Sequence, residues 1–416
     1  MTILLPGGAR NGIVRAVPSK SAAHRLFFCA ALGARPCEIV CDPLSADLEA
    51  TLGCLRALGA SVSHADGRVR IEPIRSVPAG ELLLPCGESG TTLRFLLPLA
   101  GALGASAVFE RRGRLPLRPL EPLVSELRRH GMTIEDKGDA LRCSGRLRGG
   151  EWTLPGGVSS QFVSALLLAL PLTEEDSSLT VVPPVESAPY VALTERVLVS
   201  ASIRFSHDGD VYAIPARQRP ALPRLLAVEG DWSNAAPFLA MGALSESGVA
   251  VTGLDPDSAQ GDRAVCGLLR AFGAEVFVED DLVSVRKKEL RGIRFDASQT
   301  PDLAPVIAAL GALAAGETRI ENAARLRGKE SDRLFSGAAM LRSLGADVTE
   351  LPDGLLIRGK ASLPGGAADS FADHRIAMAA AVAACGCEEG ATLRGAECVG
   401  KSCPRFWDDL RSLGGF

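Results

Sequence analysis

The amino-acid sequence predicts an α/β (α+β) protein of two domains. Each domain is expected to hold three copies of one unit of short strands and two helices, with buried helices at the centre. The two domains are expected to close on an interdomain cleft. Three observations predict this fold: the length, a motif repeated at helix ends, and a series of polar helix starts. A chain of 416 residues exceeds the size at which a single hydrophobic core usually keeps growing.

The motif Leu-Arg-Ala-Leu-Gly-Ala is typical of the end of an amphipathic helix and recurs along the chain. Its first copy, at 55–60, completes a stripe of leucines spaced four and three residues apart: Leu48, Leu52, Leu55 and Leu58. The glycine supplies the left-handed residue that ends a helix at little cost, and short strands are expected after it. Related copies begin 69 to 72 residues apart, at positions 127, 198 (without the glycine), 269, 341 and 410.

Polar clusters open Ala- and Leu-rich helices in phase with this motif, near residues 20, 91, 160, 232, 302 and 374. The helices behind them, such as 162–170, are apolar on all sides, which is typical of helices inside a domain. Six units in two sets of three favour two threefold bundles over one long array. The predicted domains are 1–17 with 230–416, and 18–229, with a hinge at the Pro- and Arg-rich stretch 215–224.

Charge and cysteine usage exclude several classes of protein. The net charge of -4 argues against a nucleic-acid surface, which normally needs a basic excess. The longest uncharged stretch, 152–173, is interrupted by Pro and Gly, so we expect no membrane span. The first 12 residues do not resemble a signal peptide. The eleven cysteines show no disulfide-like or zinc-like grouping, since Cys385 and Cys387 lack a partner pair. We therefore expect a soluble cytoplasmic protein without a metal.

The polar helix starts are candidate anion-binding sites, because a helix N-terminus exposes unpaired N–H groups and a partial positive charge. Capping alone could explain the hydroxyl of Ser19. Six clusters in phase, several with extra charge, favour ligand binding. The three richest clusters are Ser-Lys-Ser-Ala-Ala-His-Arg (19–25), Lys-Glu-Ser-Asp-Arg (329–333) and Asp-His-Arg (373–375).

The segment 395–402 matches the G-x-x-x-x-G-K-S pattern of a nucleotide phosphate loop letter for letter. That motif needs a following helix and a parallel sheet that continues beyond it. Only residues 403–416 remain, and Pro404 follows at once, so we do not expect an ATP-binding loop. Lys401 can still contact a phosphate without such a fold.

Taken in order, these stretches and others resemble the 5-enolpyruvylshikimate-3-phosphate synthase family of enolpyruvyl transferases. The resemblance runs from Lys20 to Lys401, and the set of motifs is far more specific than any one of them. The family fold is two domains of three repeated units each. The motifs are Pro-Ser-Lys-Ser-x-x-x-Arg (18–25), Gly-x-Ser-Gly-Thr-Thr-x-Arg (87–94), Arg-Pro-Leu (118–120), Ser-Ser-Gln-Phe (159–162), Pro-Asp (301–302), Lys-Glu-Ser-Asp-Arg (329–333) and Asp-His-Arg-x-Ala-Met (373–378).

The resemblance implies two small-molecule substrates, in the shikimate pathway of aromatic amino-acid biosynthesis, and no cofactor or metal. It also implies which residues hold each substrate. Shikimate 3-phosphate would be held by Lys20, Ser21, Arg25, Ser159, Ser160, Gln161, Ser187, Tyr190, Asp302 and Lys329. Phosphoenolpyruvate would be held by Lys20, Gly90, Thr91, Arg118, Gln161, Arg333, His374, Arg375 and Lys401.

The reaction that the resemblance implies is an addition followed by an elimination, which needs an acid and a base near the reacting atoms. By analogy Asp302 is the base, Glu330 exchanges protons with the substrate carbon, and Lys20 assists the departing phosphate. The residues alone would favour simpler roles, with Asp302 as a helix cap and Glu330 as a partner of Arg333. We expect a monomer. Gly90 keeps the small residue at the herbicide-contact position, so inhibition by glyphosate is expected.

Two other functions are compatible with parts of this pattern. The sister enzyme that transfers enolpyruvate to UDP-N-acetylglucosamine typically has Lys-Asn where Lys20 and Ser21 stand, and a reactive Cys where this chain has Gly113. A non-catalytic binding protein on the same scaffold could have lost Lys20, Asp302 or Glu330, yet all three are present. Two residues depart from the family pattern. Many members have Asn at the position of Glu88, and some members have Asn at the position of Arg325.

Overall fold

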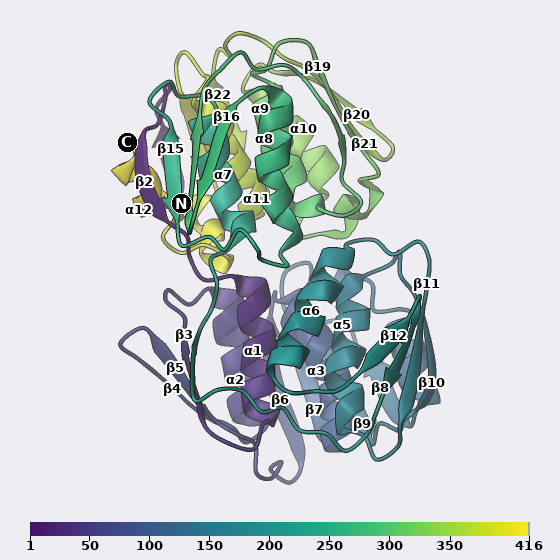
Figure 1. Cartoon of the computed structure of the whole chain (residues 1–416). Helices are drawn as coiled ribbons and strands as arrows, with labels where there is room; N and C mark the ends of the chain where they lie inside the picture. The colour runs from purple at the N-terminus through teal and green to yellow at the C-terminus, as the bar shows by residue number, and fades with distance from the viewer. Residues whose placement is uncertain (415–416) are drawn as a thin grey trace. The chain divides into compact units, whose positions relative to one another are not determined.

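The computed structural model describes residues 1–414, and the chain divides into two compact units (Figure 1). The split unit contains Met1–Ser19 and the chain from Glu229 onward, and the continuous unit contains Lys20–Val228. The stretch 215–224 lies inside the continuous unit, where the side chain of Gln218 is bonded to backbone atoms of Arg204 and Pro215. The hinge predicted there was therefore misplaced, because the chain changes unit a few residues later.

The continuous unit contains three copies of one pattern, each with a buried helix, an amphipathic helix and a four-stranded sheet. The first copy contains α1 (Lys20–Leu32), β3 (Cys37–Val40), α2 (Ala46–Ala57), β4 (Ser61–Ala65), β5 (Arg68–Glu72) and β14 (Leu225–Ala227). The second contains β6 (Glu81–Gly87), α3 (Gly90–Leu103), β7 (Ser106–Arg111), α4 (Leu123–Arg129), β8 (Met132–Asp136) and β9 (Ala140–Gly145). The third contains β10 (Gly150–Pro155), α5 (Ser160–Ala169), β11 (Ser177–Val182), α6 (Ala188–Ser200), β12 (Ser206–Asp208) and β13 (Val211–Ile214).

The second copy shows the pattern most completely. Strands β6 and β7 are parallel, and α3 connects them. Helix α4 then leads into the antiparallel hairpin β8–β9, in which β9 pairs with β7. The motif glycines that end the second helix of a copy have φ between 91° and 104°. A side chain at these positions would be strained, which explains why the motif keeps glycine at Gly59, Gly131, Gly273 and Gly345.

The split unit repeats the pattern three times, with a three-stranded sheet in the last copy, and draws two strands from the start of the chain. One copy contains β2 (Gly12–Arg15), α7 (Trp232–Gly242), β15 (Val249–Thr252), α8 (Val265–Phe272), β16 (Glu275–Glu279) and β17 (Leu282–Arg286). The next contains β18 (Arg294–Asp296), α9 (Ala304–Gly311), β19 (Glu317–Glu321), α10 (Arg333–Ser343), β20 (Asp347–Leu351) and β21 (Gly354–Arg358). The last contains β22 (Gly366–Asp369), α11 (His374–Ala384), β23 (Ala391–Arg394), α12 (Phe406–Ser412) and β1 (Thr2–Leu5). The final motif copy ends at Gly415, outside the described residues.

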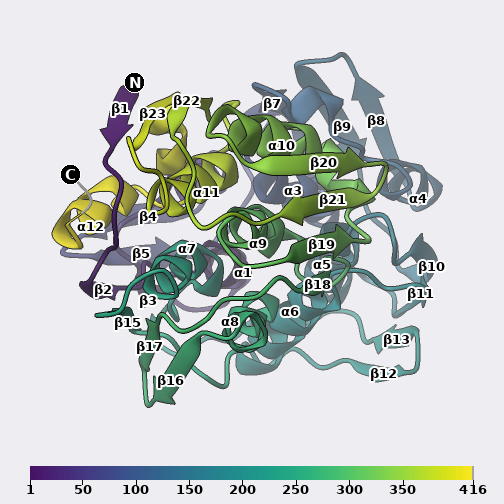
Figure 2. The ribbon, with the colours of Figure 1, turned by 90° about the horizontal axis from the view of Figure 1, so that it is seen from above.

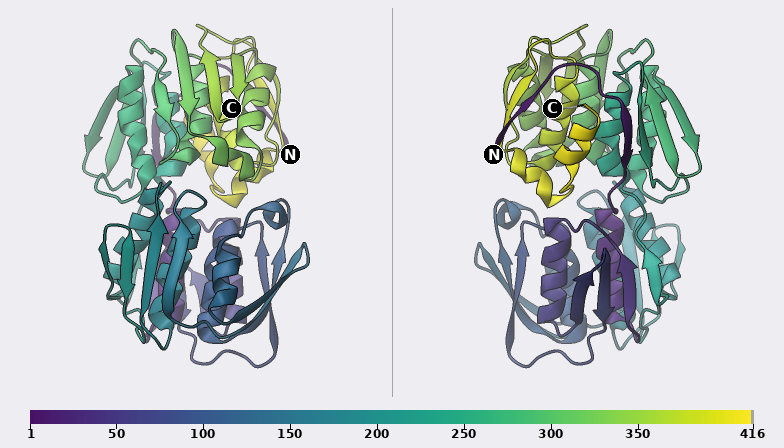
Figure 3. Two further views of the ribbon diagram at one scale, coloured as in Figure 1. Left: turned by 90° about the vertical axis from the view of Figure 1, so that its right-hand side faces the viewer. Right: turned by 90° about the vertical axis from the view of Figure 1, so that its left-hand side faces the viewer.

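The first strand of the chain completes the last copy, because β1 pairs antiparallel with β23 (Figure 3, right). Strand β2 pairs in parallel with β15, at the start of the fourth copy. The N-terminal segment thus closes the split unit before the chain enters the continuous unit.

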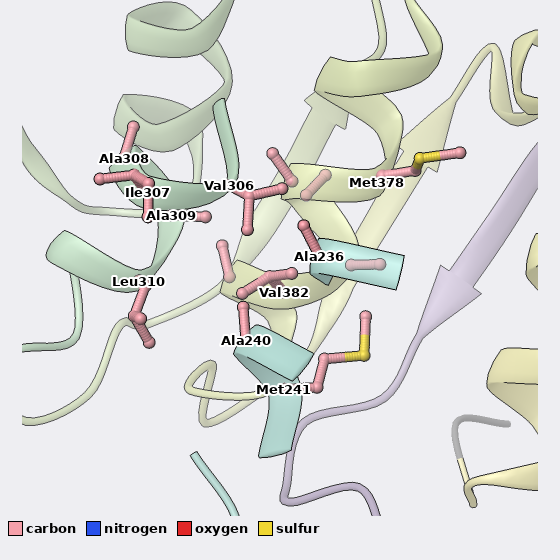
Figure 4. Packing of buried hydrophobic residues seen from close by; sticks show 14 of the residues in the cluster. Ala236, Ala240, Met241, Val306, Ile307, Ala308, Ala309, Leu310, Met378 and Val382 are labelled. Atoms are coloured by element: carbon pink, nitrogen blue, oxygen red, sulfur yellow. The ribbon is translucent and has the colours of Figure 1, made fainter. Parts of the chain in front are cut away.

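The hydrophobic core of the split unit lies among its three buried helices, α7, α9 and α11, with the sheets around them (Figure 2). Small side chains such as Ala236 and Ala240 of α7 face Val306 of α9 and Val382 of α11 (Figure 4). Because alanine side chains are small, the helix backbones can approach closely, and the core between them is still filled. Every residue of α11 is buried, which confirms the prediction of helices inside a domain. The continuous unit has a separate core that includes α3 and α5.

Within residues 1–414, no helix is both long enough and apolar enough to cross a membrane. All eleven cysteines lie in this range and are free thiols. The mixed α/β fold class predicted from the sequence is confirmed.

Candidate active site

The start of α1 in the continuous unit places Lys20 beside an acidic residue of α2. The Lys20 ammonium lies 2.8 Å from Oδ2 of Asp47. A cation at a helix N-terminus is unfavourable by itself, so Asp47 offsets that cost when no other anion is present. Burial lowers the pKa of the neighbouring His24 to about 3, so its ring is neutral. Lys20 is therefore the cation that this helix start offers to a ligand.

Arg25, one turn and a half into α1, is buried and holds the start of α6 in place. Its Nε donates to Thr194 Oγ1 at 2.7 Å, and its Nη2 donates to the carbonyl oxygen of Tyr190 at 2.8 Å. Its Nη1 donates to the carbonyl oxygen of Ser21 at 2.6 Å. The guanidinium thus contacts two other predicted shikimate 3-phosphate residues, Ser21 and Tyr190, and most of its donors are already used by neutral acceptors.

The starts of α3 and α5 are joined through Gln161. Its Nε2 donates to Thr91 Oγ1 at 2.8 Å, and its Oε1 accepts from Nη1 of Arg94 at 2.6 Å. Arg94 is buried and also donates to the carbonyl oxygen of Pro119 at 2.8 Å. Arg94 therefore holds the side chain of Gln161 and the backbone of Pro119, which follows Arg118.

The Arg118 guanidinium lies against the first residue of α3. An ideal Cβ added to Gly90 would lie 2.7 Å from Nη1 of Arg118, so the absence of a side chain at Gly90 is what lets the guanidinium approach the helix N-terminus. Glycine is used where another group must come this close to the backbone. The remaining predicted residues also sit at helix starts: Ser159 is the N-cap of α5, Ser160 its first residue, and Ser187, at φ 55°, the N-cap of α6.

In the split unit, Arg333 lies at the centre of a cluster of carboxylates. Its Nη1 donates to Oδ1 of Asp302 at 2.8 Å, and its Nη2 donates to Oε2 of Glu330 at 2.9 Å. Its Nε donates to Oδ2 of Asp373 at 2.8 Å. The side chains of Arg333 and Asp373 are 2% and 0% exposed, so this pairing is enclosed and its geometry is fixed.

Three further cations surround the same carboxylates. Lys329 Nζ lies 3.6 Å from Oδ1 of Asp302, and Lys401 Nζ lies 3.8 Å from Oε1 of Glu330. Arg375, the second residue of α11, has Nη2 4.0 Å from Oδ2 of Asp302 and donates through Nη1 to the carbonyl oxygen of Ser233 at 2.6 Å. His374 is buried beside Asp373, with Nδ1 3.8 Å from Oδ1.

These charges decide the ionisation of Asp302. Burial by itself would raise the pKa of this carboxyl, but Lys329, Arg333 and Arg375 hold it well below its usual range. The three carboxylates in turn raise the pKa of Arg333. Asp302 is therefore ionised at neutral pH, and it becomes a stronger base when a bound anion neutralises part of the surrounding positive charge.

The structure brings together all the predicted residues of the split unit, with Arg333 as their hub. In the continuous unit it forms two groups, one around Arg25 and one around Gln161, and pairs Lys20 with Asp47. Sequence reasoning missed Asp47, Arg94 and Asp373. Arg94 and Asp373 stood inside quoted motifs, so their positions were visible although their partners were not.

The remaining sequence features also have a place. Segment 395–402 forms a 3-10 helix, Ala396–Lys401, instead of a glycine-rich loop. Arg325 donates to the carbonyl oxygen of Ser298 at 3.0 Å. A Cβ at Gly113 would meet the Glu88 carboxylate at 2.5 Å, and φ there is 55°, so a cysteine at this position would be strained.

Among the described residues, no group of three or more His, Cys, Asp or Glu side chains could hold a metal ion.

Solved structures identify the class of fold. An enolpyruvyl transferase, NikO of Streptomyces tendae, matches with a TM-score of 0.81 at 21% identity, over 100% of this chain and 97% of that one. EPSP synthase of Acinetobacter baumannii matches with a TM-score of 0.83 at 27% identity, over 100% of this chain and 98% of that one. The fold is that of the enolpyruvyl transferases.

Sequence relatives identify the family within that class. The family model for EPSP synthase (3-phosphoshikimate 1-carboxyvinyltransferase) matches residues 5–410. The 3-phosphoshikimate 1-carboxyvinyltransferase of Clostridium kluyveri is 39% identical, over 97% of this chain and 95% of the relative. That of Methanocorpusculum labreanum is 36% identical, over 100% and 99%. The chain belongs to the EPSP synthase family.

Proposed function

We propose that the chain transfers the enolpyruvyl group of phosphoenolpyruvate to the 5-hydroxyl of shikimate 3-phosphate and releases phosphate. Membership of the EPSP synthase family supports this activity. The structural observation that carries it is the cluster around Arg333, where the carboxylates of Asp302 and Glu330 lie among cations. Such a cluster suits a substrate with a carboxylate and a phosphate, because guanidinium groups bind both bidentately.

Each unit would supply part of the substrate contacts. In the continuous unit, the group around Arg25 would bind shikimate 3-phosphate together with Ser159 and Ser160. Gly90, Thr91 and Arg118 would bind phosphoenolpyruvate, and Lys20 and Gln161 would contact both substrates. In the split unit, Arg333, His374, Arg375 and Lys401 would bind phosphoenolpyruvate, while Asp302 and Lys329 would contact the shikimate ring.

In the addition step, the 5-hydroxyl oxygen forms a bond to C2 of phosphoenolpyruvate. Asp302 takes the hydroxyl proton. Glu330, which takes up a proton from water when the substrate anions bind to its partners Arg333 and Lys401, delivers that proton to C3, so a tetrahedral adduct results. The depressed pKa of Asp302 in the free protein fits this role. Substrate anions share the charges of Lys329 and Arg375, so the carboxylate gains basicity at the moment it is needed.

In the elimination step, the bond between C2 and the phosphate oxygen breaks. Glu330 takes a proton back from C3, the enolpyruvyl double bond forms, and Lys20 stabilises the departing phosphate as a point charge. The proton held by Asp302 leaves with the products. The two steps use no oxidant, reductant or cofactor, and we propose a cytoplasmic monomer that acts on small molecules, without nucleic-acid or membrane partners.

Phosphate release from the purified protein, with both substrates and EDTA present, tests this proposal. Release that requires both shikimate 3-phosphate and phosphoenolpyruvate is the expected result. Release with UDP-N-acetylglucosamine as acceptor, and none with shikimate 3-phosphate, would contradict it in favour of the sister enzyme. Binding of shikimate 3-phosphate in calorimetry without any turnover would contradict it in favour of a binding protein.

A further inference from the structure

Asp262 is a buried carboxyl group that the proposed mechanism does not use. It lies in the 3-10 helix Gly261–Ala264, which precedes α8. Its Oδ2 accepts a hydrogen bond from the hydroxyl of Ser233, in the first turn of α7, while its buried Oδ1 has no hydrogen-bond partner among the described residues. A buried ionised carboxylate with an unsatisfied oxygen is costly, so the neutral form is favoured here.

The charged groups that face Asp262 come from three other elements. Burial raises the pKa of Asp262 to about 7, and the negative charges of Asp302 and of Asp231, the N-cap of α7, act in the same direction. The Arg375 guanidinium at the start of α11 and the Ser233 hydroxyl act in the opposite direction. A carboxyl in this position changes its charge near neutral pH.

Asp262 is connected to Arg375 by two routes. Ser233 is shared: its hydroxyl donates to Asp262, and its carbonyl oxygen accepts from Nη1 of Arg375 at 2.6 Å. The Arg375 guanidinium is also attracted by the negative charges of Asp302, Asp231 and Asp262. An ionised Asp262 therefore attracts the Arg375 guanidinium in competition with a substrate anion, and it repels that anion.

We propose that Asp262 is a positioning residue for phosphoenolpyruvate binding, which frees Arg375 for the substrate when it takes up a proton. This inference rests on the proposed function, because that function assigns Arg375 to phosphoenolpyruvate. The arriving anion disfavours the charged form of Asp262 further, so binding and protonation favour each other.

The sign of the pH effect follows from this linkage. Below about pH 7 Asp262 is already neutral, so the binding of phosphoenolpyruvate requires no proton uptake by this carboxyl. Above it, each binding event must first protonate Asp262, so the KM for phosphoenolpyruvate rises with pH. If Asp262 stays neutral in the substrate-bound protein throughout this range, the rise is about fivefold from pH 7 to pH 8. The kcat, measured at saturation, stays unchanged.

The test compares wild type with Asp262→Asn, which mimics the neutral carboxyl at every pH. The KM for phosphoenolpyruvate is measured with saturating shikimate 3-phosphate, in steps of about half a pH unit from about pH 6.5 to about pH 8.5. The expected result is a rise in wild type and a flat profile in the variant, apart from titration of the substrate phosphate, which both share. Asp280→Asn, at an exposed hairpin turn with φ 48°, is the matched control and should behave as wild type.

A second measurement needs only the wild-type protein, in case the variant does not fold. Its infrared spectrum should lose a protonated-carboxyl band between about pH 6 and 8.5, and the band should return when phosphoenolpyruvate is added at the higher pH. Identical KM profiles in wild type and Asp262→Asn, or no such band, would overturn the inference. Absence of wild-type turnover at every pH would instead overturn the proposed function, so the two failures are distinguishable.

Discussion

Replacing Gly90 by alanine tests how closely Arg118 approaches the start of α3. The new Cβ would lie 2.7 Å from Nη1 and 3.0 Å from Cζ of Arg118. Ordinary contacts begin at 3.4 Å, so Nη1 must move by 3.4 − 2.7 = 0.7 Å. Misplacing a binding group by about 1 Å can cost about 100-fold. We therefore expect the KM for phosphoenolpyruvate to rise by about 10- to 100-fold, which corresponds to about 1.4 to 2.8 kcal/mol.

The assay is initial-rate phosphate release with each substrate varied in turn. The KM for shikimate 3-phosphate should change little, because the groups around Arg25 are not displaced. Gly53→Ala is the matched control, since it lies in α2 of the same unit and a Cβ there meets nothing within 4 Å. Wild type should be inhibited by glyphosate and Gly90→Ala much less so. An unchanged KM for phosphoenolpyruvate in Gly90→Ala, or an equal loss for both substrates, would refute this account of Arg118.

Three further substitutions test the split unit. Asp302→Asn should lower turnover by about 100-fold or more while calorimetry still detects binding of shikimate 3-phosphate; normal turnover would exclude Asp302 as the base. Arg333→Met should lower the free energy of unfolding in urea by about 3–5 kcal/mol, because it leaves the buried Asp373 without the guanidinium that balances its charge. The half-exposed Arg327, replaced in the same way, should cost about 1 kcal/mol or less, and equal losses would show that burial is unimportant here. Ala372→Gly should raise stability by about 1 kcal/mol, because Ala372 has φ 54°, and a lower melting temperature would argue against strain.

The sequence predicts the helices of the site better than the contacts between them. The phase of the polar clusters places all six buried helices close to where they begin, at Lys20, Gly90, Ser160, Trp232, Ala304 and His374. A helix start can be read locally because capping and periodicity involve residues a few positions apart. The choice of ion-pair partners involves residues far apart in sequence, such as Arg333 and Asp373, and the motifs contain no information about it.

Asp373 illustrates why a site residue can be read only in part. From sequence it is the N-cap of α11, and its Oδ1 does accept from the backbone N–H of Arg375 at 2.9 Å. The same carboxylate also accepts from Arg333 and from the hydroxyl of Ser331. It therefore fixes the helix start and the central guanidinium together. A charge-neutral cap such as Asn would preserve the first role and weaken the second.

The repeats also do not predict which strands complete the sheets of each unit. Every copy looks alike along the sequence, yet the strand that completes a copy can come from a distant segment. Thr2 pairs with Arg394 in the last copy, and Leu225 pairs with Glu38 in the first. Sheet edges favour any strand of the right pattern, so the unpaired edge of an incomplete copy must be filled by whichever segment the topology brings there. The chain passes between the units at Ser19–Lys20 and Val228–Glu229, just after the strands β2 and β14. Strand β2 pairs with β15 of the split unit and β14 pairs with β3 of the continuous unit, so each strand must reach its sheet before the chain changes unit.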